Sequence, residues 1–331
     1  MFRWKSQVSM QSASTQVPKT HHHAMPAQET DGGLSRLGCF VLALLMQVSS
    51  TPGLARDAFR FQRNDRNRGE ALRIPILDEE GRSWTMEGRV CRPDNVVKPR
   101  LVVINHGAPG QAVERLGMRL GTCDSEAAQW FLRRRFAVVE ALRLGYGRTG
   151  GPWTEGYSNC DDADFYRIGL ETARQIKTIV DFAAALPGVD HDGVIVVGES
   201  AGGWGTLAYD SIAHSNVLAF INMAGGRGGH MDDRANSNCH VERLLQAAAQ
   251  YGRTASSPML WVYARNDTYF GPELAAKMDR SFVEAGGKVD FVTPEAFSDE
   301  GHKLFFGRSG SDTWGPVVEK YLLNVGVQGA H

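Results

Sequence analysis

The stretch VIVVGESAGGWG, residues 194–205, decides the fold of this chain. Its first four residues are apolar and β-branched, without polar alternation, which is typical of a strand buried on both faces of a sheet. Gly198, Ser200 and Gly202 then form a G-x-S-x-G motif, and residues 204–213 are predicted to be helical. This is the context of a nucleophile elbow, whose strained turn exposes the serine hydroxyl at the end of the sheet. The sequence therefore predicts Ser200 as a nucleophile.

The motif alone is weak evidence, because the chain has 37 glycines and an ordinary strand-to-helix turn can match it. The chain has 331 residues, 42% of them hydrophobic, which is enough for one large α/β domain. Lys and Arg number 36 against 37 Asp and Glu, so no basic surface for nucleic acid is indicated. No dinucleotide-binding or P-loop fingerprint is present, and no metal or organic cofactor is expected.

The N-terminal part of the chain differs from the rest. Residues 1–33 are polar and are predicted to form an extension without structure, and residues 34–55 have the features of a signal peptide. Arg36 precedes an apolar run at 39–46, and small residues lead to a cleavage position after Ala55. Translation from Met25 would give this signal the usual length. We therefore expect an exported protein, periplasmic or secreted, with no membrane span after cleavage and one domain at 56–331. The alternative to a signal peptide is that the apolar run forms a buried helix of the mature domain.

Four cysteines follow the predicted cleavage position. In an oxidising compartment they permit two disulfides, with three possible pairings, and partly buried free thiols are the alternative. No spacing typical of a zinc site occurs among them. The four are Cys91, Cys123, Cys160 and Cys239.

Apolar runs and amphipathic segments alternate along the rest of the chain. This alternation predicts an α/β fold with a mostly parallel sheet, covered by helices on both faces and begun by an antiparallel hairpin. Strands are expected at 72–77, 84–92, 101–104, 136–142, 194–197, 218–224, 258–264 and 288–292. Helices are expected at 125–135, 164–186, 204–213, 240–251, 273–285 and 313–323.

Two glycine-rich loops, at 145–162 and 225–240, follow strands that neighbour the 194–197 strand in chain order. Their tips are expected to overhang Ser200 and to form the substrate wall, because ligands of α/β sheets bind beyond the carboxyl ends of the strands. A disulfide between Cys160 and Cys239 would tie the loops together. Alternatively, the aromatic residues Trp153 and Tyr157 of the first loop only cover the sheet edge. The predicted wall residues are Trp153, Tyr157, Arg227 and Asp232.

A serine nucleophile needs a base, and the base needs an orienting carboxylate. With a nucleophile elbow the chain order is serine, acid, histidine, with each residue beyond a strand end. Asp267 follows the strand at 258–264, and His302 lies in the loop after the strand at 288–292. Asp299 and Glu300 are alternatives to Asp267, but they lie very close to His302 in sequence.

The oxyanion of an acyl-transfer reaction needs two backbone N–H donors. One is expected from Ala201, the residue after the nucleophile, and the other from the loop after the strand at 101–104. Ala108 is the preferred second donor and Gly107 the next, whereas Pro109 has no N–H to donate.

These motifs, in this order, resemble the α/β-hydrolase superfamily, and most of all its dienelactone hydrolase-related and prolyl-oligopeptidase-like branches. The motifs are NHG at 105–107, GESAG at 198–202, ARND at 264–267 and GH at 301–302. The resemblance covers about residues 72–323 and implies an eight-stranded sheet and a Ser200–Asp267–His302 triad. Dienelactone hydrolases proper use a cysteine nucleophile, so Ser200 favours general ester hydrolysis.

The expected function is therefore that of a serine esterase, which cleaves small carboxylic esters through an acyl-enzyme. A prolyl-oligopeptidase-like serine peptidase is the first alternative, although the chain has no room for the propeller domain that such enzymes usually carry. A non-catalytic binding module on the same fold is the second alternative.

Overall fold

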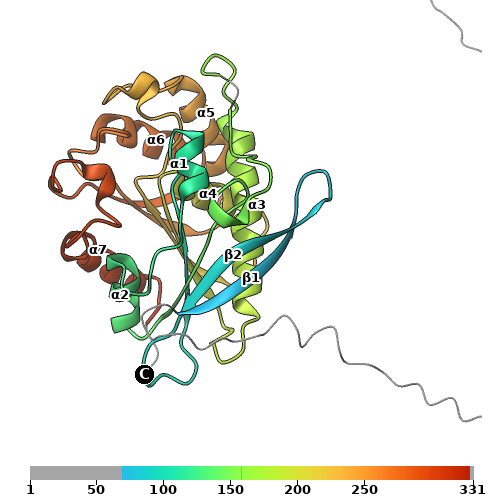
Figure 1. Cartoon of the computed structure of the whole chain (residues 1–331). Coiled ribbons are helices and arrows are strands. Elements are labelled where there is room, and N and C mark those ends of the chain that lie inside the picture. Colours follow the sequence, from blue (N-terminus) through green and yellow to red (C-terminus); the bar gives the residue numbers. More distant parts are fainter. Residues whose placement is uncertain (1–68, 158, 329–331) are drawn as a thin grey trace, which may run out of the picture. The chain divides into compact units, whose positions relative to one another are not determined.

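The computed structural model of the protein describes residues 69–157 and 159–328. The predicted extension at 1–33 and the predicted signal peptide at 34–55 lie outside the described residues. The described residues form one eight-stranded sheet with the order β1-β2-β4-β3-β5-β6-β7-β8 (Figure 1). Its strands are β1 (Glu70–Leu77), β2 (Ser83–Cys91), β3 (Leu101–Asn105), β4 (Ala137–Ala141), β5 (Val194–Glu199), β6 (Val217–Met223), β7 (Pro258–Val262) and β8 (Lys288–Val292).

The sheet begins with an antiparallel hairpin and continues as a parallel sheet, as predicted. β1 pairs with β2 and β2 pairs with β4 in antiparallel fashion, while all later neighbours are parallel. In parallel strands all carboxyl ends lie at the same edge of the sheet. The loops after β3, β5, β7 and β8, which carry the predicted site residues, are thereby brought to one edge.

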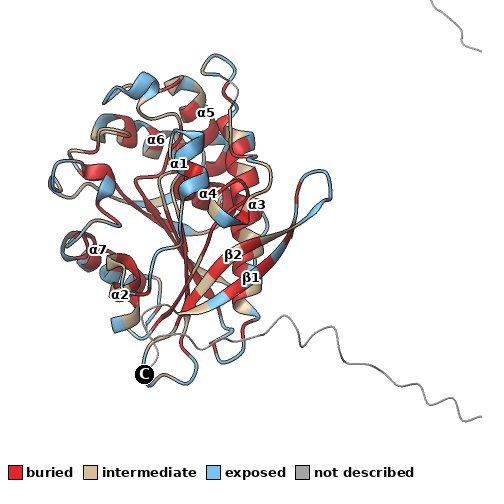
Figure 2. Ribbon diagram, viewed as in Figure 1, coloured by how far each residue is buried: buried red, intermediate tan, exposed pale blue. Residues whose placement is uncertain are grey.

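Helices cover both faces of the sheet, and the buried residues lie between the layers (Figure 2). α3 (Phe165–Ala184), α4 (Ala201–Asp210), α5 (Val241–Gly252) and α6 (Pro272–Glu284) pack on one face. α2 (Glu126–Arg133) and α7 (Ser311–Asn324) pack on the other. This three-layer arrangement buries both faces of the central strands, which explains their continuous apolar sequences.

β5 shows how the continuous apolar run serves both layers. Val194 and Val196 face the α3 side, whereas Ile195 and Val197 face the α7 side, and all four are buried. Successive side chains of a strand point to opposite faces, so a strand in the middle of the sheet needs apolar residues at every position. β5 is therefore fixed in the centre of the sheet, with Ser200 directly beyond its end.

The predicted elements differ from the observed ones mainly at their ends. The helix predicted to begin at residue 204 starts at Ala201, because the chain enters α4 directly from the turn at Ser200. The short helix α1 (Ala112–Gly117) was not predicted, nor were the one-turn 3₁₀ helices η2 (Gly147–Thr149), η3 (Met231–Asp233) and η4 (Gly301–Lys303). Such short helices carry little periodic signal in a sequence.

Two disulfides join segments that are distant in the sequence. Cys91 at the end of β2 is bonded to Cys123, and Cys160 is bonded to Cys239, with Cα atoms 5.6 and 5.2 Å apart. The second bond joins the two glycine-rich loops in the pairing that the sequence analysis favours. No helix among the described residues is long and apolar enough to cross a membrane.

Candidate active site

Ser200 lies on the turn between β5 and α4 with a backbone conformation that an L-residue rarely adopts, φ 54° and ψ −118°. A Cβ atom on Gly198 would lie 2.2 Å from the carbonyl oxygen of Gly202, and one on Gly202 would lie 2.4 Å from that of Asn105. Both flanking positions therefore require glycine, because the strand, the turn and β3 approach too closely for any side chain. This is the strained elbow geometry that the motif predicts.

Asp267 and His302 are hydrogen-bonded beyond the ends of β7 and β8. Asp267 Oδ2 lies 3.0 Å from His302 Nδ1, and both side chains are buried. Asp267 Oδ1 accepts the backbone N–H groups of Tyr269 and Phe270 at 2.8 and 2.9 Å. The aspartate is thus held by two backbone donors while its second oxygen orients the imidazole, so the His302 proton is held at Nδ1 and Nε2 is left as the acceptor.

Glu300, an alternative acid in the sequence analysis, does not contact the His302 ring through a hydrogen bond. Its carboxylate accepts the backbone N–H groups of His302 and Thr268, each at 3.0 Å. It therefore fixes the backbone of η4 and of the loop after β7. The structure favours Asp267 over Glu300 as the orienting carboxylate.

The electrostatic environment favours the protonated form of His302. Burial alone would lower the pKa of His302, but the hydrogen bond and the charge of Asp267, together with the charges of Glu199 and Glu300, raise it above its ordinary value. Burial in turn raises the pKa of Glu199, against the opposing effect of the His302 charge. His302 Nε2 and Glu199 Oε1 are 3.7 Å apart. Glu199, the second residue of the G-x-S-x-G motif, is thus a charged neighbour of His302 that the sequence analysis did not identify.

Ser200 and His302 line the same hollow, which encloses about 530 Å³. The loop after β3 forms one wall from His106 to Gly110, and Tyr269 lies opposite with its ring stacked on His302, centroids 4.3 Å apart. Among the described residues, Ser200 Oγ makes no hydrogen bond. Catalytic hydrogen bonds are commonly longer in a free enzyme and tighten when the substrate binds. No group of three or more His, Cys, Asp or Glu among the described residues is placed to hold a metal ion.

Gly107 and Ala108 both line this hollow. A Cβ on Gly107 would lie 2.4 Å from Glu199 Oε2 and 3.0 Å from Ser200 Cβ, so only glycine fits between them. The backbone N–H of Gly107 interacts with the Glu199 carboxyl group and acts to lower its pKa. Since Gly107 is thereby engaged, Ala108 is the better candidate for the second oxyanion donor, beside Ala201 at the start of α4.

The loop that carries Ala108 is held by His106. Its Nε2 accepts the backbone N–H of Arg143 at 3.2 Å, so Nδ1 carries the proton and donates to the Gly107 carbonyl oxygen at 2.6 Å. Burial, and then the charge of Arg143, lower the pKa of His106 to about 3. His106 is therefore neutral at ordinary pH and links the loop after β3 to the end of β4.

Comparison with solved structures identifies proteins that share this fold. An acylaminoacyl peptidase aligns at 16% identity with a TM-score of 0.53, over 76% of this chain and 41% of the peptidase. An esterase from Pyrococcus furiosus aligns at 13% identity with a TM-score of 0.51, over 77% of this chain and 91% of the esterase. Acetyl xylan esterase 1 from Thermoanaerobacterium aligns at 14% identity with a TM-score of 0.50, over 80% and 86% of the two chains.

This chain has the α/β-hydrolase fold. It spans less than half of the length of the acylaminoacyl peptidase. No protein-family model matches the sequence, and no curated protein does. At these identities the likeness establishes the fold, and the chemistry has to be argued from the site.

In this α/β-hydrolase domain, Arg227, a predicted substrate-binding residue, does not line the hollow of Ser200. Its guanidinium is buried and donates to the carbonyl oxygen and carboxylate of Glu155. Arg143 forms a two-bond ion pair with the same carboxylate, and Tyr146 donates its hydroxyl to it at 2.8 Å. Burial would raise the pKa of Glu155, but the two arginines lower it to about 2.

This buried cluster gives Arg227 structural contacts. It joins the loop at 145–162 to the end of β4 and to the loop at 225–240. The physical reason is charge: two arginines on neighbouring segments can be buried when a carboxylate pairs with both. A sequence gives no local sign of such a pairing, because Glu155 and Arg227 are 72 positions apart.

The other three predicted wall residues also lie outside the lining of the hollow. Trp153 is 38% exposed, donates its indole N–H to the Tyr146 hydroxyl at 3.2 Å, and lies under the guanidinium of Arg115, 3.5 Å from the ring centroid. Tyr157 packs edge-on against Phe165. Asp232 is exposed on η3.

Proposed function

We propose that this chain is an exported serine hydrolase that cleaves carboxylic esters through an acyl-enzyme intermediate. The proposal rests on one observation: the strained Ser200 and the Asp267-oriented His302 line the same hollow beyond the carboxyl ends of the strands. A serine on an elbow, a histidine base and a buried carboxylate are the three groups that this chemistry requires.

In the first half of the reaction, Ser200 Oγ attacks the carbonyl carbon of the ester. His302 Nε2 takes the proton of the hydroxyl, and the resulting imidazolium is stabilised by Asp267 at Nδ1. The carbonyl oxygen becomes an oxyanion, which accepts hydrogen bonds from the backbone N–H groups of Ala201 and Ala108. When the bond to the leaving alkoxide breaks, His302 returns the proton to it, and the alcohol departs.

In the second half, water attacks the acyl-serine with His302 again acting as the base. The carbon–oxygen bond to Ser200 breaks, His302 protonates Oγ, and the acid is released. The raised pKa of His302 implies that the base is neutral, and the enzyme active, only on the alkaline side of that pKa.

Export and the esterase branch are further parts of the proposal. Two disulfides among the described residues are typical of an oxidising compartment and support export. The serine at position 200 supports general ester hydrolysis over the lactone chemistry of cysteine-dependent dienelactone hydrolases. The peptidase alternative uses the same three groups, so substrates must separate the two.

The test is a substrate panel measured with the wild type and with Ser200→Ala. We expect hydrolysis of nitrophenyl esters of short acids, slower or no hydrolysis of aminoacyl anilides, and a loss on the order of 10⁴-fold or more in the variant. Faster cleavage of the anilides would assign the peptidase function instead. Ester hydrolysis that survives Ser200→Ala within tenfold of wild type would refute both.

A further inference from the structure

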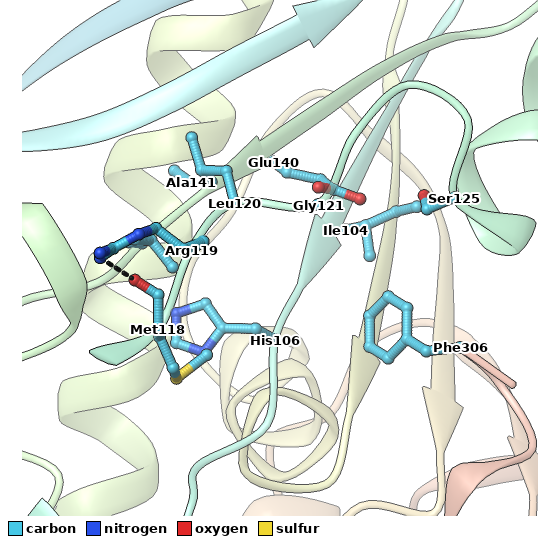
Figure 3. A pocket seen from close by; sticks show the side chains of 11 residues that line it. Ile104, His106, Met118, Arg119, Leu120, Gly121, Ser125, Glu140, Ala141 and Phe306 are labelled. Atoms are coloured by element: carbon cyan, nitrogen blue, oxygen red, sulfur yellow. Dashed lines mark hydrogen bonds between the residues drawn. The ribbon is translucent and has the colours of Figure 1, made fainter. Parts of the chain in front are cut away.

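A second cavity of about 220 Å³, whose lining is drawn in Figure 3, adjoins the hollow of Ser200. His106, Met118 and Phe306 line both spaces, so the two share a wall. The side chains of Ile104, Leu120 and Leu142 make most of the remaining surface apolar. A substrate bound at Ser200 therefore has an apolar space within reach of one of its two halves.

Glu140, the last but one residue of β4, lies in the lining of this mostly apolar cavity, which His106, Arg119 and Ser125 also line (Figure 3). Among the described residues, its carboxyl group has no hydrogen-bond partner. A Cβ on Gly121 would lie 2.8 Å from Glu140 Oε2, so the backbone at Gly121 packs directly on the carboxyl group. Burial raises the pKa of Glu140 to about 7. Glu140 is half-buried, and a carboxyl group in mostly apolar surroundings is stabilised by a hydrogen-bond partner in the cavity.

Arg89 is the cross-strand neighbour of Glu140, but no ion pair joins these two described residues. Arg89 Nη1 is itself buried without a hydrogen-bond partner, and its charge acts to lower the pKa of Glu140. A cationic ligand group would be repelled by this guanidinium. A neutral hydroxyl is not repelled. It can donate a hydrogen bond to the ionised carboxylate, and it can accept one from the O–H of the protonated carboxyl group.

We infer that this cavity is a specificity subsite for a compact apolar group that carries a hydroxyl, with Glu140 as the hydrogen-bond partner of that hydroxyl. An apolar cavity of about 150 Å³ is known to hold benzene, so this space admits a ring with one hydroxyl substituent. The inference rests on the proposed ester hydrolysis and names one element of its substrate. Glu140 takes no part in the bond-breaking steps.

The experiment compares two pairs of esters that differ only in a para-hydroxyl group. Methyl hydroxyphenylpropanoate and methyl phenylpropanoate test the acid half of the ester, while hydroxyphenylethyl acetate and phenylethyl acetate test the alcohol half. The wild type should prefer the hydroxylated member of one pair by about tenfold in kcat/KM, the effect of one hydrogen bond to a half-buried carboxyl group.

Glu140→Leu should abolish that preference, bringing the ratio within the pair to about one or below. Glu140→Met serves the same purpose if the leucine variant does not fold. Glu284→Leu is the matched control, because Glu284 is an exposed residue at the end of α6 and lines neither cavity; the ratio should stay at its wild-type value. Equal rates for both members of both pairs in the wild type, or a preference that survives Glu140→Leu, would overturn the inference.

Binding separates this inference from the proposed function. Titration calorimetry of the same four esters with Ser200→Ala measures the affinity without turnover and should show the same preference of about tenfold. If the wild type hydrolyses none of the esters but the Ser200→Ala variant retains the Glu140-dependent binding preference, the proposed function fails and the subsite stands. Hydrolysis without any such binding preference would reject the subsite alone.

Discussion

Replacing Asp267 with asparagine changes one atom of the buried pair with His302. Asp267 Oδ1 accepts two backbone N–H groups, from Tyr269 and Phe270, and Oδ2 lies 3.0 Å from His302 Nδ1. In the variant, the amide oxygen should keep the two backbone bonds, since the opposite orientation would leave two buried donors unsatisfied at about 1–3 kcal/mol each. The amide NH₂ group then faces Nδ1 and requires it to be an acceptor.

The consequence is that His302 carries its proton on Nε2, where the base must be free. The imidazole cannot accept the Ser200 proton in this tautomer, and the negative charge that stabilises the imidazolium is also lost. A change of this kind lowers turnover on the order of 10⁴-fold, equivalent to about 5.4 kcal/mol in the activation free energy. Substrate binding should change little, because Asp267 is buried and does not line the hollow.

The assay is steady-state hydrolysis of a nitrophenyl ester, with kcat and KM measured separately and folding checked by circular dichroism. Glu300→Gln is the matched control. The Glu300 carboxylate accepts hydrogen bonds from backbone N–H groups but none from the imidazole ring, so kcat should fall by less than about tenfold in this variant. If Asp267→Asn retains kcat within tenfold of wild type while Glu300→Gln does not, the assignment of the acid is refuted.

Three further predictions concern charge and stability. Glu199→Gln removes a negative charge that raises the pKa of His302, so the acid limb of the kcat/KM profile should move to lower pH; an unmoved or upward-shifted limb would contradict this. Glu155→Gln leaves two buried arginines without their carboxylate, so the free energy of unfolding measured in urea should fall by about 3–5 kcal/mol. A loss under about 1 kcal/mol would show that the cluster is not a buried ion pair. Replacing both Cys160 and Cys239 with serine removes a disulfide between residues 79 positions apart and should destabilise the fold by about 2–4 kcal/mol without a large loss of kcat/KM. Unchanged stability would indicate that the disulfide does not form.

The sequence was sufficient to predict the sheet and the residues beyond its strand ends. Ser200, Asp267 and His302 could be selected as candidates because each follows a recognisable apolar run, and parallel strands bring their carboxyl ends to one edge. The mostly parallel sheet with helices on both faces is confirmed for the same reason.

The lining of the site could not be predicted in this way. Arg227 was expected to contact the substrate because it lies in a polar, glycine-rich loop. In the structure it is buried and paired with Glu155, whose position depends on the path of another loop. Glu199 and Glu140 were overlooked because a single acidic residue at the end of an apolar strand has no periodic signal. The distance of Glu199 from His302 and the place of Glu140 in a cavity lining are known only from the structure.

The most direct test of the central claim, that Ser200 is an activated nucleophile, is labelling with a fluorophosphonate probe followed by peptide mapping. Reaction requires a serine activated by a neighbouring base, so the account predicts stoichiometric modification at Ser200 alone, and labelling on the order of 10³-fold slower in His302→Ala. Modification at another residue, or labelling of Ser200 that proceeds at the wild-type rate without His302, would contradict it.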